Sequence, residues 1–359
     1  MLYLDNAAAA MPEPETLELA RRLWSEDFAN QESGHALGFE LRHKLGAAAE
    51  SLSHTFRGRG GGRVVWGNSC TELFQLLAAS PLVAGREVVS SVLEHPALSA
   101  ALKREARKVT LLRSGRNGQL IPEPRTGVAL VALHQVQSEL GAVQDLAALY
   151  AAFPGAVRFA DAAQAAGKLA FPDADIVAVS GAKLGVPGGG AALLLSPDWE
   201  GAGKFADFAA AFRSRDHRIS RVHPVLPQLL AFAAERRAAA AETARSAAEK
   251  FNLLVRSRLA GSRLRPTLEV AAASPFILHL SAPGMQGAVL MRMLSEAGVM
   301  VSAGSACAAE SRDPSPALLA LGYSRSDAYG GLRISVGWRI EAGSADILCA
   351  ALEKVLQNY

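Results

Sequence analysis

Short apolar runs alternate with longer helical patterns through the middle of the chain. Several of these runs are almost entirely Val, Ala and Leu, which is typical of strands that are covered on both faces. Helical patterns at residues 97–106 and 146–153 lie between them. The alternation predicts a largely parallel α/β sheet. Its strands are expected at residues 87–91, 109–112, 128–133, 157–160, 176–179 and 191–195.

The pattern changes in the last third of the chain. An Ala-, Glu- and Arg-rich stretch with a stripe of Leu and Phe predicts one long interdomain helix over residues 227–259. We predict a large α/β domain over residues 12–254, and a smaller α+β domain made of residues 1–11 and 255–359 that carries a loop around Cys307. The elements expected in its C-terminal part are a strand at 276–280, a helix at 286–297, a strand at 332–336 and a helix at 342–357.

Composition narrows the classes of protein. The 359 residues are 50% hydrophobic and 20% charged, which is typical of a globular protein, and the net charge is only +3. No long run of Lys or Arg favours nucleic acid or a membrane surface as a partner, and no apolar run approaches the ~18 residues of a membrane span. The three cysteines, at positions 70, 307 and 349, are too widely spaced for a disulfide framework or a metal site. With no secretory signal at the start, these features favour the reducing cytoplasm.

Two polar motifs follow predicted strands, where ligands gather in open α/β sheets. ADAAQAAGK places Asp161 and Gln164 directly after one strand, and the carboxylate could either cap the next helix or serve a site. SGAK places Lys183 after the next strand. This lysine could point to solvent, but in an apolar pocket a lysine loses its proton and can form a Schiff base with an aldehyde cofactor. Ser180 would offer a hydroxyl to a phosphate.

A third candidate is Cys307, in SAGSACAAESRDPSPALLALG. Its small neighbours predict that the thiol is exposed on a mobile loop. An exposed thiol is either reactive or accidental, and the segment by itself does not decide between the two.

Seven motifs follow one another along the chain: YLDNAAAA, EHPAL, SELGAVQD, ADAAQAAGK, SGAK, GSACAAESRDPS and LRISVG. Their order and approximate spacing resemble the cysteine desulfurases, which belong to the class V aminotransferase group of fold-type I pyridoxal-phosphate enzymes. The resemblance runs essentially from end to end, and the combination is specific although SGAK alone is weak. The length of the segment from Cys307 to Arg333 is similar to that of the long-loop subgroup, whose members pass sulfur to iron–sulfur scaffolds.

The resemblance implies an enzyme that converts L-cysteine to L-alanine with pyridoxal 5'-phosphate (PLP). Lys183 would hold the cofactor and move the Cα proton of the substrate. His95, in EHPAL, would stack on the cofactor ring and donate or accept a proton. Arg333, in LRISVG, would bind the substrate carboxylate. Cys307 would take the sulfur as a persulfide.

The resemblance also implies a set of cofactor contacts. Asp161 would pair with the pyridine nitrogen and Gln164 would reach the phenolic oxygen. Thr71, in NSCTEL, and Ser180 would hold the phosphate, and Gln137 would touch the ring edge. The expected partners are L-cysteine, a sulfur-acceptor protein such as an iron–sulfur scaffold, and a second copy of the chain in a homodimer.

Some positions depart from the pattern of the family. Ala182 stands where the family has a histidine, and positions 137 and 138 hold Gln and Ser where it has two asparagines. Residues 220–223 replace an Arg-Ser-Gly-Thr segment that reaches a phosphate across the dimer interface, and Arg221 or His223 could substitute for it. These changes predict weaker binding of the phosphate. They spare the lysine, the aspartate, the arginine and the nucleophile.

Two other functions remain open. A selenocysteine lyase, or another PLP-dependent β-lyase, would keep the cofactor site but would not need Cys307. A non-catalytic homologue would bind sulfur-transfer partners without holding the cofactor, and a colourless purified protein would favour it.

Overall fold

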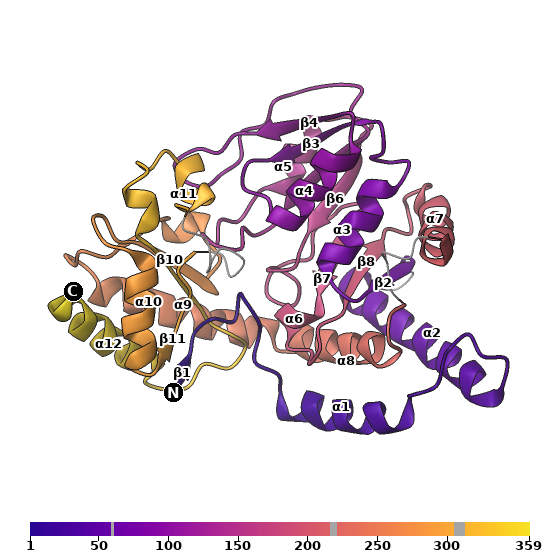
Figure 1. The fold of residues 1–359 in the computed structure, drawn as a ribbon, viewed down its shortest axis with the longest axis horizontal. Coiled ribbons are helices and arrows are strands. Elements are labelled where there is room, and N and C mark those ends of the chain that lie inside the picture. Colours follow the sequence, from indigo (N-terminus) through magenta and orange to yellow (C-terminus); the bar gives the residue numbers. More distant parts are fainter. Residues whose placement is uncertain (59–60, 216–220, 305–312) are drawn as a thin grey trace.

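The large sheet is mostly parallel, as the sequence predicts. The computed structural model describes residues 1–58, 61–215, 221–304 and 313–359. Within them, seven strands lie in the order β2-β8-β7-β6-β5-β3-β4, and only β8 runs antiparallel to its neighbours (Figure 1). The strands are β2 (Val64–Gly67), β3 (Glu87–Ser91), β4 (Lys108–Leu112), β5 (Leu130–His134), β6 (Val157–Asp161), β7 (Ile176–Ser180) and β8 (Ala191–Leu195).

All six predicted strands of this sheet are confirmed, and β3 and β8 match their predicted ranges. Strand β2 was not predicted. It has only four residues, its burial alternates, and it pairs only with β8 at the edge of the sheet. Such a short edge strand gives little periodic signal.

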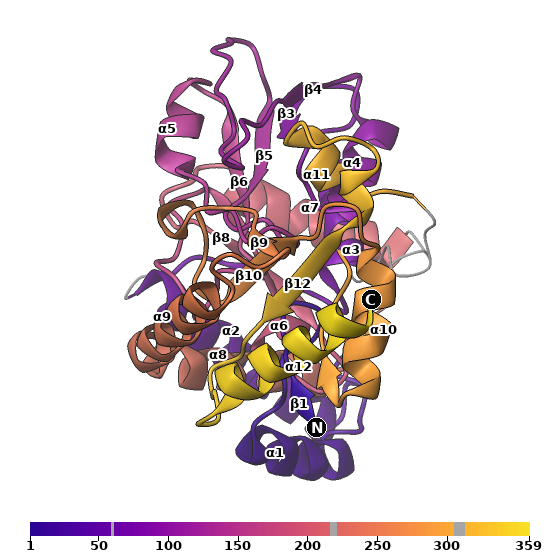
Figure 2. The same cartoon turned by 90° about the vertical axis from the view of Figure 1, so that its left-hand side faces the viewer.

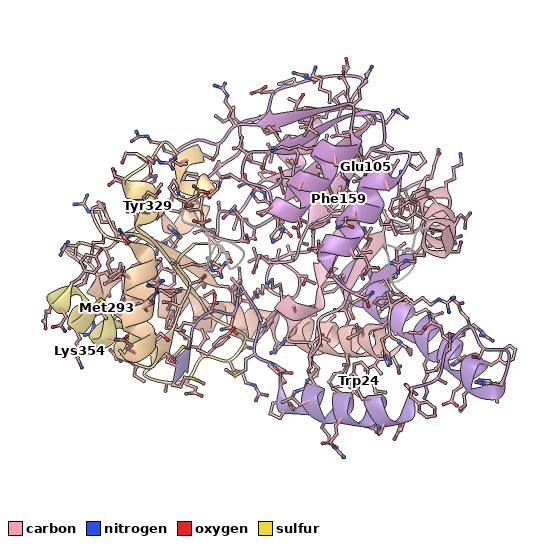
Figure 3. All side chains as sticks on the ribbon, in the orientation of Figure 1. Trp24, Glu105, Phe159, Met293, Tyr329 and Lys354 are labelled. Atoms are coloured by element: carbon pink, nitrogen blue, oxygen red, sulfur yellow. The ribbon has the colours of Figure 1, made fainter. Side chains whose placement is uncertain are left out.

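Helices cover both faces of the sheet, which explains its apolar strands. On one face, α3 (Cys70–Ala79) and α4 (Pro96–Glu105) share an apolar core with the sheet, where Phe74 and Phe159 meet edge to face with ring centroids 6.0 Å apart. On the other face, α5 (Leu146–Ala151) packs in a second core. Figure 3 labels Phe159, which belongs to the core on the side of α3 and α4.

The prediction of one helix over residues 227–259 is wrong. The structure has two helices, α8 (Val225–Ala239) and α9 (Ala241–Arg258), separated at Ala240, whose ψ is 0° instead of a helical value. The chain turns here because the helices pack on different neighbours, α8 against α2 (Ala36–Arg57) and α9 against α12 (Ser344–Asn358). Alanine favours helix, so the sequence carries no sign of the break.

The C-terminal part forms smaller sheets beside the large one (Figures 1 and 2). The predicted strands β10 (Ile277–Ser281) and β12 (Gly331–Ser335) are confirmed and pair antiparallel. The beginning of the chain belongs here too, since β1 (Leu2–Tyr3) pairs with β11 (Val299–Met300). The predicted domain limits, 11/12 and 254/255, stay a prediction. The remaining elements are β9 (Arg265–Pro266), α10 (Gly287–Glu296) and α11 (Pro316–Ala320), with short 3-10 turns at Val270–Ala272 and Asp327–Tyr329.

Helices α1 (Pro14–Glu26) and α2 lie along the edge of the molecule, and α7 (Ala202–Arg215) lies beside β2 (Figure 1). Large apolar side chains of α1 and α2 are exposed: Trp24, labelled in Figure 3, by 47% and Phe39 by 61%. Phe28, just after α1, is exposed by 70%. Among the helices that the structure describes, none is long and apolar enough to cross a bilayer.

Lys168 follows the motif residues Asp161 and Gln164 along the chain. Its side chain is buried against the rings of Phe276 and Trp338. Its Nζ lies 4.9 Å from the ring centroid of Trp338, and burial lowers its pKa to about 7. Between about pH 7 and 10.5 the unfolded chain therefore binds more protons than the folded protein, so the free energy of unfolding should rise with pH in this window. In urea unfolding, Lys168→Met should flatten this rise, whereas Lys250→Met, at an exposed position of α9, should preserve it. If the free energy of unfolding rose with pH equally steeply in the wild type and in Lys168→Met, the lowered pKa of Lys168 would be contradicted.

Candidate active site

Neighbouring strands of the large sheet carry polar residues at the same edge. Strands β5, β6 and β7 are parallel and end at His134, Asp161 and Ser180. A cavity of about 170 Å³ with an open mouth lies at this edge. Six of the predicted residues line it: Thr71, His95, Asp161, Gln164, Ser180 and Lys183.

Helix α3 points its N-terminus into the cavity. Ser69 caps it by accepting a hydrogen bond from the N–H of Glu72 (3.2 Å), and Thr71 follows in the first turn. Ser69, Cys70 and Thr71 all line the cavity. A helix N-terminus offers N–H donors and a partial positive charge, so this end of the cavity suits a phosphate.

The Ser69 cap predicts a stability effect that does not depend on a ligand. Ser69→Ala should lower the free energy of unfolding by about 1 kcal/mol, because the N–H of Glu72 loses its acceptor. Urea unfolding of the cofactor-free protein measures this loss. Ser25→Ala is the control, because that hydroxyl only donates to carbonyls of its own helix. A Ser69→Ala variant as stable as Ser25→Ala would rule out the cap.

Lys183 lies on the short helix α6 (Gly181–Leu184), directly after β7. Its Nζ donates to the carbonyl of Ala8, and the N–H of Ala10 donates to the carbonyl of Ala182 at 2.9 Å. The motif YLDNAAAA therefore borders the lysine. Gly181 is required before it, since a Cβ there would come within 2.2 Å of the carbonyl oxygen of Gly189.

Asp161 and Gln164 lie opposite this lysine, at the end of β6. The Oδ1 of Asp161 accepts from the N–H of Ala163 (2.9 Å) and closes a turn, so the expectation of a helix cap is not met. The Nε2 of Gln164 donates to the carbonyl of Ala7 (2.9 Å). Its Oε1 is buried and has no hydrogen-bond partner among the described residues. A polar atom left in this state calls for a partner from the cavity.

His95 caps α4 and faces Asp161 across the cavity. Its Nδ1 accepts from the N–H of Ala97 (3.2 Å). Burial lowers the pKa of His95, and the charge of Asp161 opposes that effect. Burial raises the pKa of Asp161, opposed by the N–H of Ala163 and by the charge of His95. A histidine held in its neutral form is suited to exchange protons near neutral pH.

Two predicted residues do not line the cavity. Gln137 bonds only to the backbone, since its Oε1 accepts from the N–H groups of Glu139 (2.8 Å) and Leu140 (2.6 Å). Arg333 is 1% exposed and forms an ion pair with Asp5 at 2.7 Å. It also donates to the carbonyl of Ser138 (2.8 Å), a residue of the cavity wall. Arg333 thus reaches the edge of the cavity but not its centre.

The predicted nucleophile Cys307 lies outside the described residues. The candidates for an extra phosphate contact, Arg221 and His223, do not line the cavity. Arg221 pairs with Glu32 (2.8 Å), and the ring of His223 lies 4.3 Å from that of Trp24. In the single chain neither side chain reaches the phosphate end.

Two polar residues of the site were missed by the sequence analysis. His134 lines the cavity, and its Nδ1 lies 2.8 Å from Oε1 of the buried Glu94. A signal was present, because a histidine ends the otherwise apolar strand LVALH. The predicted strand ended at residue 133, so His134 was not considered as a site residue.

The residues of the cavity fit PLP. An amine for its aldehyde (Lys183), a carboxylate for its ring nitrogen (Asp161) and the N-terminus of α3 for its phosphate surround one space. Oε1 of Gln164 is buried and makes no hydrogen bond among the described residues, so a polar group of the cofactor would supply the partner that this atom needs. Ser180 and Thr71 would add hydroxyls to the phosphate end.

Known proteins resemble this chain over nearly its whole length. The family model "Aminotransferase class-V" matches residues 2–348. A cysteine desulfurase of Gluconacetobacter diazotrophicus is 27% identical, covering 93% of this chain and 88% of that protein, and one of Cereibacter sphaeroides is 27% identical over 99% and 96%. The solved structure of a NifS-like protein from Rickettsia africae has a TM-score of 0.83 at 17% identity, covering 99% of both chains.

These findings confirm the predicted fold class and the resemblance drawn from the motifs. The family model spans nearly the whole chain, and the likeness to the solved structure shows that the large and small sheets have the arrangement of the NifS-like fold. The cofactor of the family, PLP, fits the cavity that the structure contains. This chain belongs to the class V aminotransferase family of PLP enzymes.

Proposed function

We propose that this protein is a cysteine desulfurase, which converts L-cysteine to L-alanine and keeps the sulfur as a persulfide on Cys307. One observation carries the proposal: Lys183, Asp161 and His95, from three separate motifs, line a single cavity. The named relatives, which are cysteine desulfurases matched over nearly their whole length, support this substrate and this chemistry.

The residues of the cavity divide the work on the cofactor. When bound, PLP supplies an electron sink for the Cα of the substrate. Lys183 holds the cofactor through its Nζ and moves the proton at the substrate Cα. Asp161 keeps a proton on the pyridine nitrogen, and Gln164 hydrogen-bonds to the phenolic oxygen. His95, on the wall of the same cavity, would stack on the cofactor ring and exchange a proton with the substrate.

The sulfur step belongs to Cys307. Its thiolate attacks the sulfur of bound cysteine, so that an S–S bond forms while the Cβ–S bond of the substrate breaks. The electron pair of the broken bond stays with the substrate, whose Cβ takes a proton and becomes the methyl group of alanine. Arg333 binds the substrate carboxylate. To do so, its guanidinium gives up the ion pair with Asp5 and forms an ion pair with the substrate.

The partners of the protein follow from this reaction. A persulfide needs an acceptor, and an iron–sulfur scaffold suits a chain with a long segment between Cys307 and Arg333. We also propose a homodimer. The exposed side chains of Phe28 and Phe39 support it, since such apolar groups are often covered by a second copy. The cysteine pattern favours the cytoplasm as its location.

Analysis of the products tests the proposal. Purified protein loaded with PLP is incubated with L-cysteine and a thiol reductant, and alanine, sulfide and pyruvate are measured. We expect alanine and sulfide in equal amounts. Pyruvate and ammonia in place of alanine would indicate a β-lyase. In a parallel assay with L-selenocysteine, turnover of selenocysteine but not of cysteine would indicate a selenocysteine lyase. No product with either amino acid would support the non-catalytic homologue.

A further inference from the structure

A buried pair of ionisable side chains borders the cavity and has no part in the proposed reaction. Nδ1 of His134 lies 2.8 Å from Oε1 of Glu94, and the two residues are 4% and 8% exposed. The same carboxylate oxygen accepts from the hydroxyl of Ser91 at 2.7 Å. Because an ionised carboxylate only accepts hydrogen bonds, Nδ1 carries the proton of the bond to Glu94. The ring of His134 is therefore fixed by Glu94.

The other ring nitrogen faces a different environment. Nε2 of His134 is buried and has no hydrogen-bond partner among the described residues, although His134 lines the cavity. Leaving a polar atom buried and unpaired costs free energy. Because His134 also lines the cavity, we look for its role among the groups of the site.

The nearest functional group along the sheet is Asp161. His134 and Asp161 are register partners on the adjacent parallel strands β5 and β6, so their side chains leave the same face of the sheet. Both line the cavity. Glu94, His134 and Asp161 therefore form a row of acidic, basic and acidic groups across the strand ends.

The charge of Asp161 needs support in this place. Its side chain is 8% exposed within an apolar layer, and burial raises its pKa. The N–H of Ala163 and the charges of His95 and His134 oppose the rise, while the charge of Glu94 adds to it. His95 is itself kept toward its neutral form by burial. His134 is the histidine of this set whose ring nitrogen lies within hydrogen-bond distance of a carboxylate, that of Glu94 (2.8 Å).

We propose that His134, oriented by Glu94, is a positioning residue that supports the ionised form of Asp161, so that Asp161 holds the proton on the pyridine nitrogen of PLP. The inference rests on the proposed cofactor role of Asp161 and extends it to a row of three residues. His134 acts through the carboxylate and does not react with the substrate. Its removal should change the binding of PLP and the pH at which the bound cofactor changes its spectrum.

The test uses His134→Gln in full-length protein, with His279→Gln as the matched control. His279 is also a buried histidine (2% exposed) whose Nε2 makes no hydrogen bond among the described residues and lies 3.8 Å from Oε1 of Glu139, but it does not line the cavity. Melting temperatures establish that each variant is folded. The affinity for PLP is measured by titrating cofactor-free protein, and the acid-side midpoint of the visible spectrum is measured on loaded protein. His134→Leu serves as a second variant if His134→Gln does not fold.

The expected result is an affinity for PLP about 10-fold weaker in His134→Gln, the size of one lost interaction with a charged group. Without the neighbouring imidazole, Asp161 takes up a proton more readily, so the acid-side midpoint should move up by about one pH unit. His279→Gln should change neither value.

Other outcomes separate this inference from the proposed function. A folded His134→Gln protein with the affinity and midpoint of the wild type overturns the inference, and so does a lower melting temperature with an unchanged midpoint. A wild-type protein that binds no PLP overturns it together with the cofactor assignment. A shifted midpoint in a protein that makes no alanine from cysteine supports the inference and removes the proposed function.

Discussion

Lys183→Ala is expected to abolish turnover of L-cysteine, with a loss of at least about 10³-fold in rate. The Nζ of Lys183 is the amine that borders the carboxylate of Asp161 and the imidazole of His95 in one cavity. Under the proposed function, its removal takes away both the attachment of PLP and the base that moves the Cα proton. Alanine formation measures the rate, and the visible absorbance of the loaded protein reports the attachment.

Two further variants show which property of the lysine matters. Lys183→Arg keeps a positive charge but cannot attach the cofactor, so it should be as inactive as Lys183→Ala. Lys168→Met removes a nearby buried lysine that does not line the cavity, and it should keep the visible absorbance. Normal turnover in Lys183→Ala would refute the assignment of the lysine.

Cys307→Ala is expected to separate cofactor binding from sulfur transfer. The variant should bind PLP like the wild type, because the residues that surround the cavity are unchanged. Alanine formation should fall by about 10³-fold or more, since no other group accepts the sulfur. The measurement is alanine produced per loaded protein, together with the mass of the peptide that contains residue 307 after a single turnover.

The other two cysteines provide the control for this variant. Cys349 is buried in α12, and burial raises the pKa of the Cys70 thiol in the cavity wall, so neither is a ready nucleophile. Cys349→Ala should keep full activity. Sulfide release that persists at the normal rate in Cys307→Ala would change the interpretation to a β-lyase.

Much of this site can be predicted from the sequence because it is built at strand ends. Asp161 and Ser180 end strands that read as apolar runs, and Lys183 follows after two small residues. Parallel strands bring such ends to one edge of the sheet, so residues from separate motifs meet in one cavity. The motifs then supply the chemistry, which the pattern of the strands does not contain.

The parts that the sequence did not predict depend on contacts between distant segments. The carbonyl of Ala8, which accepts from Lys183, is a backbone atom and has no signature in a sequence. The pairing of Arg333 with Asp5 joins the two ends of the chain. The break at Ala240 is set by the packing of α8 and α9, since its own residue type favours a continuous helix.

One measurement tests the central claim most directly: the visible absorbance of the purified protein, supplied with PLP, before and after addition of L-cysteine, with alanine quantified in the same sample. The account predicts an absorbance band of lysine-bound PLP that changes when cysteine is added, while alanine accumulates. A protein that stays colourless with excess PLP, and forms no alanine, would contradict it.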